Sequence, residues 1–306
     1  MKTIVTTGNL YIDIDGMACA LAYKELQAKK GIDSEVVFLS EPNSTVPKTV
    51  KSWGLNYKSS VPKNNDNLNF VIVDCANPKL MPSFVNLSKV VKVYDHHIFG
   101  EEKLWENYKA DVIIEPVGSC ATLIWEEFKS SNLNGKISNV SANLLYTAIF
   151  SNTLNFNASV TTERDVLAAK ELLRYTKLPG NWIRKYYEES EQQTFCDPKL
   201  AVENDTKVVD FPEKNIKITI GQIEMWNSKD FILNNQNTIK DALVSFGIDK
   251  WFLTAPSISE SKNYIYTENN ELKSLLAKTI NADFDGNLGT TPKLWLRKEI
   301  LKKIIK

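Results

Sequence analysis

A run of apolar residues that ends in an aspartate, Leu68–Asp74 (LNFVIVD), constrains the fold more than any other feature of the sequence. The run shows no alternation of apolar and polar residues, which is typical of a strand buried on both faces of a parallel sheet. Shorter β-branched runs predict further strands at Thr3–Thr7, Glu35–Leu39, Val90–Tyr94 and Val112–Ile114. The first half of the chain therefore contains the strands of a parallel sheet.

Amphipathic segments separate or follow these strands. They predict helices at Asp15–Lys29, Ser119–Lys129, Asn139–Phe150 and Thr162–Tyr175. Strands that alternate with helices indicate an α/β fold in which helices flank a parallel sheet.

The character of the sequence changes near Leu178, and a polar run (KYYEESEQQ) follows, which is typical of a linker or an exposed helix. We expect a first domain over residues 1–180, a linker over 181–192 and a smaller α/β domain with a mixed sheet over 193–306. In this second half the pattern predicts strands at Ile216–Ile223, Trp251–Ala255 and Asn263–Thr267. It predicts helices at Lys229–Phe246 and Glu271–Ile280.

Composition excludes several classes of protein. The chain has 306 residues, enough for two domains, and its formal net charge is zero, which gives no indication of a nucleic-acid or membrane partner. No apolar stretch reaches membrane-spanning length, and the N-terminus lacks the apolar segment of a signal peptide. The four cysteines are widely spaced, as in a reduced protein. We expect a cytoplasmic protein.

Acidic side chains and the chain's only two histidines follow three of the predicted strands. Asp13 and Asp15 follow the first strand, Asp74 ends the third, and His96 follows the fourth within Asp95-His96-His97 (DHH). Each cluster alone has a simpler interpretation. Asp15 could cap a helix, Asp74 a loop, and the histidine pair could bond to the loop backbone.

Taken together, the clusters predict a metal centre. The carboxyl ends of parallel strands share one edge of a sheet, where ligand sites collect. Carboxylates and imidazole are common ligands of divalent ions. Four such side chains at one edge suffice for two ions that share a water and lower its pKa.

The motifs around these residues resemble the DHH phosphoesterase superfamily. The stretches are TGNLYIDIDGMACALAY, VIVDCANP, VYDHHIFG, IIEPVGSCATLI and TAIFSNTLNF, in the order that the family shows. The closer resemblance is to the branch of family II inorganic pyrophosphatases and prune-type exopolyphosphatases. It covers most of the chain and is strongest over the first 175 or so residues; the second half is similar to a DHH-associated domain.

This resemblance implies a role for each site residue. Asp13 and Asp74 would hold one metal ion, and Asp15, Asp74 and His96 the other, so that Asp74 bridges the two. His97 would contact the phosphate, and His97 and Asp74 would be the catalytic residues. Lys207, Arg297 and Lys298 of the second domain would clamp the substrate. The cofactors implied are two Mn²⁺ or Mg²⁺ ions, with Co²⁺ as an alternative.

Three positions depart from the family pattern. Asn9 stands where family II pyrophosphatases have histidine, and in this it resembles the exopolyphosphatase and prune branch. Asn152 stands where the family has an aspartate that binds the second metal; its amide oxygen can ligate a cation but brings no charge. Leu296 replaces the serine of the Ser-Arg-Lys motif.

We therefore expect a metal-dependent phosphohydrolase that releases orthophosphate from pyrophosphate or short polyphosphate by attack of a metal-activated water. The alternative is a catalytically weakened relative that binds phosphate compounds or proteins, because Asn152 removes a carboxylate. A single-strand nuclease is a third interpretation, but the glycine-rich signature of its associated domain is absent from the sequence. Gly118-Ser119-Cys120 precedes a predicted helix whose amides either meet a phosphate or are capped by Ser119. The chain is expected to be a monomer or a homodimer.

Overall fold

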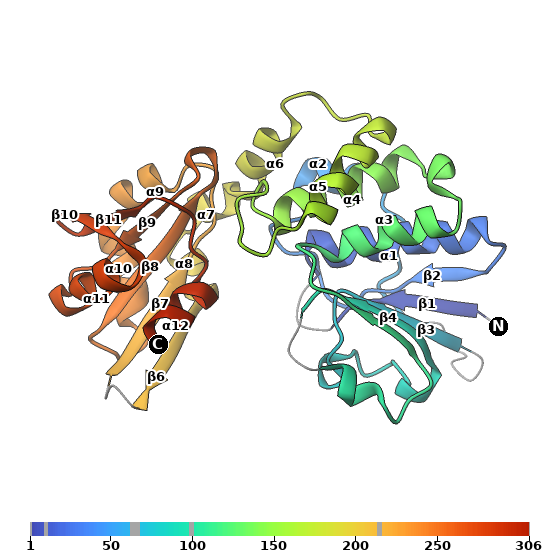
Figure 1. Ribbon diagram of the computed structural model, residues 1–306, viewed down its shortest axis with the longest axis horizontal. Coiled ribbons are helices and arrows are strands. Elements are labelled where there is room, and N and C mark those ends of the chain that lie inside the picture. Colours follow the sequence, from blue (N-terminus) through green and yellow to red (C-terminus); the bar gives the residue numbers. More distant parts are fainter. Residues whose placement is uncertain (1, 9–11, 62–67, 98–100, 213–215, 306) are drawn as a thin grey trace. The chain divides into compact units, whose positions relative to one another are not determined.

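The computed structural model describes residues 2–8, 12–61, 68–97, 101–212 and 216–305 of the chain. The chain divides into two compact units, Met1–Ile183 and Arg184–Lys306 (Figure 1). The predicted function of each unit and the limits expected for the domains stay predictions.

The first unit is built on a five-stranded sheet of order β2-β1-β3-β4-β5. All neighbouring strands are parallel, as the apolar runs predicted. The strands are β1 (Lys2–Thr6), β2 (Ser34–Val36), β3 (Leu68–Val73), β4 (Val90–Asp95) and β5 (Asp111–Ile114). Because β1, β3 and β4 are adjacent, the segments that follow them meet at one edge of the sheet.

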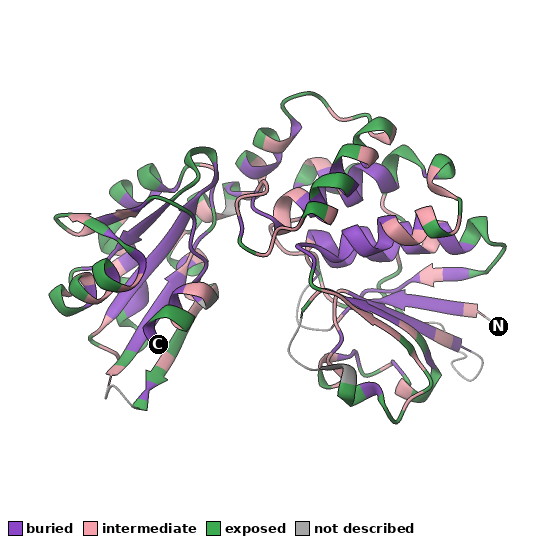
Figure 2. Cartoon of the chain, viewed as in Figure 1, coloured by how far each residue is buried: buried purple, intermediate pink, exposed green. Residues whose placement is uncertain are grey.

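Helices pack against one face of this sheet, and α1 contacts both β1 and β3. On the other face, Phe70 and Ile72 of β3 pack against Met81, Val85 and Trp105 from the connecting segments. Figure 2 shows β1 and β3 buried along most of their length. The helices are α1 (Ile14–Lys29), α2 (Lys48–Lys51), α3 (Cys120–Ser130), α4 (Asn139–Asn152) and α5 (Glu163–Leu172), with α6 (Trp182–Ser190) crossing the unit boundary.

The second unit contains a mixed six-stranded sheet of order β10-β11-β9-β8-β7-β6, in which only the β7–β8 pair is parallel. Phe252 and Ile265 of this sheet pack against Leu272 and Leu276, and Ile300 joins the same cluster. The strands are β6 (Thr206–Phe211), β7 (Ile216–Gln222), β8 (Trp251–Ser257), β9 (Lys262–Tyr266), β10 (Asp283–Asp285) and β11 (Leu288–Thr291). The helices are α7 (Gln192–Cys196), α8 (Pro198–Asn204), α9 (Ser228–Asn234), α10 (Gln236–Val244), α11 (Asn270–Ile280) and α12 (Arg297–Ile305).

The α/β fold, with helices flanking a parallel sheet and a second mixed sheet, is confirmed. The single helix predicted over Lys229–Phe246 is wrong, because α9 and α10 meet at a break. At that break the Asn235 side chain donates a 2.8 Å hydrogen bond to the Phe231 carbonyl and ends α9. The polar run after Leu178 is largely helical, and the sequence pattern did not predict β6, β10 or β11.

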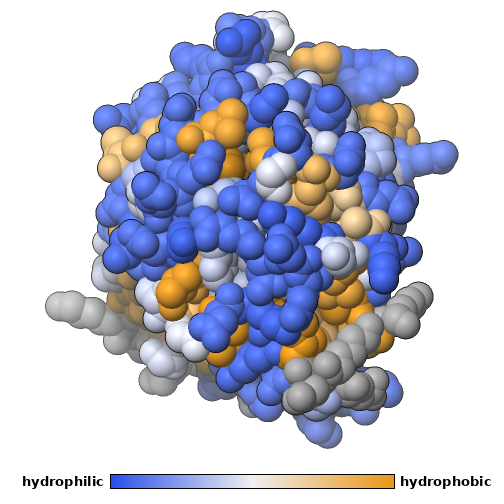
Figure 3. All heavy atoms as spheres, turned by 90° about the vertical axis from the view of Figure 1, so that its left-hand side faces the viewer, coloured by the Kyte–Doolittle hydropathy of each residue, from blue (hydrophilic) through white to orange (hydrophobic). Residues whose placement is uncertain are grey.

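In the described part of the chain, every helix is too short or too polar to span a lipid bilayer. On the face of the second unit that Figure 3 shows, hydrophobic residues occur as separate groups between hydrophilic ones. Small groups of this kind are normal on a protein surface.

Candidate metal centre

The structure brings the residues after β1, β3 and β4 together at the carboxyl edge of the first sheet. The Nε2 atom of His96 lies 3.5 Å from Oδ1 of Asp74 and 3.8 Å from Oδ2 of Asp15. Three side chains from separate segments therefore face one another. Asp74, His96 and His97 also have ligand atoms within 4.8 Å of one another.

The imidazole of His96 is held in a fixed orientation. Its Nδ1 atom lies 3.1 Å from the carbonyl oxygen of Val117. A hydrogen bond to a backbone carbonyl on one ring nitrogen leaves the other as the metal ligand, with its lone pair turned outward. In His96 this arrangement directs Nε2 toward the two carboxylates.

Asp74 has the environment expected of a metal ligand. Its side chain is 7% exposed, and its Oδ1 atom has no hydrogen-bond partner among the described residues. Burial, together with the charges of Asp15 and Asp13, raises the pKa of Asp74 well above its usual range. Its backbone is left-handed (φ 57°), which costs an L-residue roughly 1 kcal/mol. A bound cation would offset the electrostatic cost of burying the charged Asp74 carboxylate beside Asp15 and Asp13.

Asp15 is fully buried, and its carboxylate accepts hydrogen bonds at the first turn of α3. The backbone N–H groups of Cys120 and Ala121 each donate to it over 2.9 Å, and the Ser119 hydroxyl lies 3.0 Å from both oxygens. The amides at the start of α3 therefore meet a carboxylate of the chain itself. These amides are therefore not available to the phosphate that the sequence suggested at this helix start. The alternative, a helix capped by Ser119, is what the structure shows.

Asp13 occupies the N-cap of α1, where its Oδ1 atom accepts a 2.9 Å hydrogen bond from the Gly16 amide. The capping role considered for Asp15 therefore belongs to Asp13 at this helix. Asp13 keeps some contact with solvent, yet burial and the neighbouring Asp15 raise its pKa. A capping carboxylate with one engaged oxygen still has lone pairs for a cation.

Asp95, the aspartate of the DHH motif, has a different role from Asp74. The buried Asp95 accepts hydrogen bonds from the amides of Ala76, His96 and His97 over 2.5–3.1 Å. Its Oδ1 atom also lies 2.8 Å from Nδ1 of His97. Although burial opposes ionisation, the bonds and charge of His97 hold the pKa of Asp95 below its usual value. Asp95 thus fixes the loop and orients His97, whose side chain is 48% exposed.

Other predicted site residues are not joined to this cluster by any described contact. Asn9 lies outside the described residues. Asn152 ends α4, and its Nδ2 atom donates a 3.3 Å hydrogen bond to the Ala148 carbonyl of the same helix.

The predicted clamp residues belong to the second unit. Lys207 is exposed on β6, and Lys298 lies in α12. Arg297 is only 8% exposed, and its guanidinium bonds to the carboxylate (2.5 Å) and to the carbonyl (2.6 Å) of Asp205. This pairing links the start of α12 to Asp205, which lies between α8 and β6.

Sequence reasoning missed the residues that orient the ligands. Val117 and Ser119 were quoted as parts of a motif, but nothing in their residue types indicated contacts to His96 and Asp15. A helix start that follows a strand at the same sheet edge was the only available signal.

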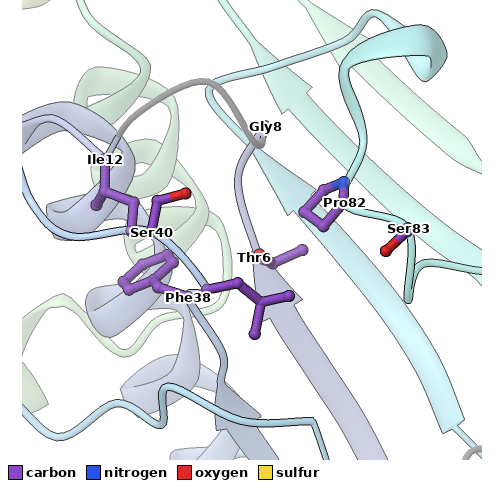
Figure 4. A pocket seen from close by; sticks show the side chains of 8 residues that line it. Thr6, Gly8, Ile12, Phe38, Ser40, Pro82 and Ser83 are labelled. Atoms are coloured by element: carbon purple, nitrogen blue, oxygen red, sulfur yellow. The ribbon is translucent and has the colours of Figure 1, made fainter.

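A hollow of about 110 Å³ lies at the same edge of the sheet, beside β1 (Figure 4). Its lining is uncharged and includes Thr6, Phe38, Ser40 and Pro82. Phosphate groups need cationic or amide donors. The described lining residues of the hollow include no cationic side chain, whereas the carboxylate and imidazole cluster could bind phosphate through cations.

Comparisons with known proteins show what the chain is similar to. Residues 3–149 match the model of the DHH family, N-terminal domain. A protein of Shouchella clausii named as a manganese-dependent inorganic pyrophosphatase is 32% identical over 174 residues. That alignment covers 56% of this chain and spans about half (54%) of the relative's length. A Bacillus cereus protein with the same name is 22% identical and aligns over 100% of this chain and 98% of its own.

Two solved structures share the fold. A Methanococcus jannaschii protein named with the family II inorganic pyrophosphatases aligns over 100% of this chain and 98% of its own, with a TM-score of 0.60 and 20% identity. An exopolyphosphatase-related protein of Bacteroides fragilis aligns over 99% of this chain and 89% of its own, with a TM-score of 0.52 and 13% identity. The matched family segment carries Asp13, Asp74 and His96. Over residues 3–149, just under half of its length, the chain thus matches the DHH family, N-terminal domain.

Proposed function

We propose that this protein hydrolyses phosphoanhydride bonds in pyrophosphate or short polyphosphate with the help of divalent cations. The observation that carries the proposal is the buried Oδ1 atom of Asp74, which faces Nε2 of His96 at 3.5 Å and has no hydrogen-bond partner within the part of the chain that the structure describes. A buried carboxylate oxygen without a partner is costly, and a cation between it and the imidazole would satisfy both.

The donor set fits manganese or magnesium. Asp13, Asp15 and Asp74 offer hard oxygen ligands, and His96 adds one imidazole nitrogen, a combination that suits Mn²⁺ better than Ca²⁺. We assign Asp13 and Asp74 to one ion and Asp15, Asp74 and His96 to the other. When bound, the ions would lower the pKa of a coordinated water and neutralise phosphate charge.

The chain's own residues would position the substrate. His97 is exposed beside Asp74, and its bond to Asp95 fixes the ring, so that it could donate a hydrogen bond to a phosphate oxygen. In the second unit Lys207 is an exposed cation suited to phosphate. Lys298 keeps its proposed clamp role, whereas the internal pairing of Arg297 argues for a structural one.

The relatives support this choice of reaction. Curated relatives carry the name manganese-dependent inorganic pyrophosphatase, and one structure with the same fold is related to exopolyphosphatases. The substrate proposed for this chain is accordingly a small phosphoanhydride. The cytoplasmic location, the monomeric or dimeric state and the absence of a nucleic-acid partner stay predictions.

A second candidate is a module that binds phosphate compounds or proteins without turnover. Asn152 favours it, because an amide replaces a carboxylate and its nitrogen bonds to the helix of which it is part. One carboxylate fewer would weaken the hold on a second cation.

A phosphate-release assay tests the proposal. The protein is incubated with pyrophosphate and with tripolyphosphate in the presence of Mn²⁺, Mg²⁺ or Co²⁺. We expect metal-dependent release of orthophosphate that Asp74→Asn abolishes. The matched control is Asp111→Asn, which changes an exposed aspartate at the opposite end of the sheet. Folded wild-type protein that releases no phosphate with any of the ions would refute hydrolysis and favour the binding module.

A further inference from the structure

The segment that leads into α3 contacts two ligands of the proposed metal centre, His96 and Asp15. The carbonyl of Val117 lies 3.1 Å from Nδ1 of His96. Two residues later, the Ser119 hydroxyl lies 3.0 Å from both oxygens of Asp15, and the next two amides bond to the same carboxylate. One five-residue segment, Val117–Ala121, thus orients side chains that follow β4 and β1.

This segment is itself fixed from behind by a second buried carboxylate. Oδ2 of Asp165 in α5 accepts a 2.8 Å bond from the Gly118 amide of the segment, while Oδ1 accepts a separate 2.6 Å bond from the Thr122 hydroxyl, beyond the segment. A side chain on Gly118 would not fit, since its Cβ would lie 2.6 Å from Thr153 and 2.9 Å from Asp165. The backbone of the segment therefore has little freedom to move relative to α5.

Ser119 has an environment suited to positioning. It is fully buried, and its hydroxyl proton has the Asp15 carboxylate as acceptor, while its oxygen caps the Ala121 amide at 3.2 Å. The bonds from α3 fix the Asp15 carboxylate with Oδ2 3.8 Å from Nε2 of His96. The positive end of α3 also stabilises the negative charge that a cation would need.

We infer that Ser119 is a positioning residue of the metal centre, acting through Asp15. The inference rests on the proposed function in that Asp15 and His96 hold a cation. Loss of the hydroxyl would let the carboxylate rotate away from His96. Groups that orient a metal ligand typically contribute 10- to 100-fold to metal affinity.

The chain offers a matched control on the same helix turn. Ser119→Ala and Thr122→Val each remove one hydroxyl that bonds to a buried carboxylate, but only Ser119 bonds to Asp15. Ser119→Gly is a second test variant, because glycine tolerates the N-cap position with little loss of helix stability. It separates the capping role of Ser119 from its bond to Asp15.

The experiment measures Mn²⁺ affinity rather than activity. Full-length protein is freed of metal with a chelator and titrated with Mn²⁺, and free Mn²⁺ is followed by electron paramagnetic resonance. We expect Ser119→Ala and Ser119→Gly to weaken Mn²⁺ binding about tenfold. Thr122→Val should keep the wild-type affinity even where thermal unfolding shows that it is destabilised.

The outcomes separate this inference from the proposed function. If both Ser119 variants bind Mn²⁺ as tightly as the wild type, or if Thr122→Val weakens binding equally, Ser119 does not position the site, and the proposed hydrolysis is unaffected. If the wild type binds Mn²⁺ with the expected Ser119 dependence but releases no phosphate, the inference holds and the hydrolysis is refuted. If the wild type binds no Mn²⁺, both are refuted.

Discussion

Replacing Asp74 with asparagine is expected to stabilise the metal-free protein and to weaken the metal-loaded one. The Oδ1 atom of Asp74 is buried and has no hydrogen-bond partner among the described residues, and the carboxylates of Asp15, Asp13 and Asp95 act on the same group. Asparagine keeps the shape of the side chain and removes the charge. The change therefore relieves repulsion when no cation is present and removes a ligand when one is.

The distances set the size of the effect. Asp74 Oδ1 and Asp15 Oδ2 lie 3.5 and 3.8 Å from the same atom of His96, so they are no more than about 7 Å apart. At an effective dielectric constant of about 20, two unit charges at that distance repel by about 2 kcal/mol. For a protein of this size, a gain of that order raises the midpoint of thermal unfolding by about 4–8 °C.

The pH dependence gives a second check, and its sign follows from the raised pKa of Asp74. The folded protein binds this proton more tightly than the unfolded chain does. The wild type therefore loses stability as the pH rises from the ordinary value of 3.8 through the folded pKa. Because asparagine does not titrate, the advantage of Asp74→Asn should be small near pH 4 and greatest above the folded pKa.

Thermal unfolding of both proteins, with and without Mn²⁺, tests this reasoning. A ligand at 100 times its dissociation constant stabilises by about 2.7 kcal/mol. Because Asp74→Asn removes a ligand, Mn²⁺ should stabilise the wild type more than this variant. The wild type should therefore unfold at a higher temperature than Asp74→Asn when Mn²⁺ is present, and at a lower temperature when it is absent. Asp111→Asn should follow the wild type. A metal-free Asp74→Asn protein that is less stable than the wild type at pH 8 would show that Asp74 is a structural acceptor rather than an unpaired ligand.

Three further changes test other parts of the structure. Asn152→Asp should raise Mn²⁺ affinity in a titration, because it adds a carboxylate; unchanged affinity and activity would contradict the role given to this position. Arg297→Ala should lower the free energy of unfolding by about 2–3 kcal/mol in urea, because it leaves the bonding groups of Asp205 unpaired; a change below about 0.5 kcal/mol would show that the pairing is not structural. Burial raises the pKa of Glu191 to about 7, so this residue should cost stability as the pH rises from 4.5 to 7, and unfolding midpoints of Glu191→Gln should lack that part of the pH dependence.

Much of the first unit could be predicted because its strands are unambiguous. Leu68–Val73 is apolar apart from Asn69, and an aspartate directly follows this strand, as another ends the neighbouring strand β4. The second unit was harder. The edge strand β6 has mostly exposed or half-buried residues, and the short pair β10 and β11 joins through a turn at Gly286 with φ +61°. Strands of this kind lack the apolar pattern on which sequence interpretation depends.

The candidate ligands could be predicted as a group, but not the part that each plays. Asp13 and Asp15 are two residues apart and identical in type, yet one caps α1 and the other is enclosed at the start of α3. The enclosure of Asp15 depends on its contact with Ser119, which lies more than a hundred residues further along the chain. Contacts of such sequence separation leave no local pattern, so only the structure could assign them.

Asp74 and Asp95 show why the hydrogen-bond partners, rather than the motif, distinguish a ligand from a residue that orients one. Both are buried aspartates at the ends of adjacent parallel strands. Asp95 accepts three hydrogen bonds from backbone amides, and the pKa of its carboxyl is lowered. One oxygen of Asp74 has no partner among the residues described, and the pKa of its carboxyl is raised. A carboxylate that the protein has already satisfied gains little from a cation, whereas one that is buried and unsatisfied gains a great deal. The proposed metal centre therefore forms at Asp74, and Asp95 serves it by fixing the loop that carries both histidines.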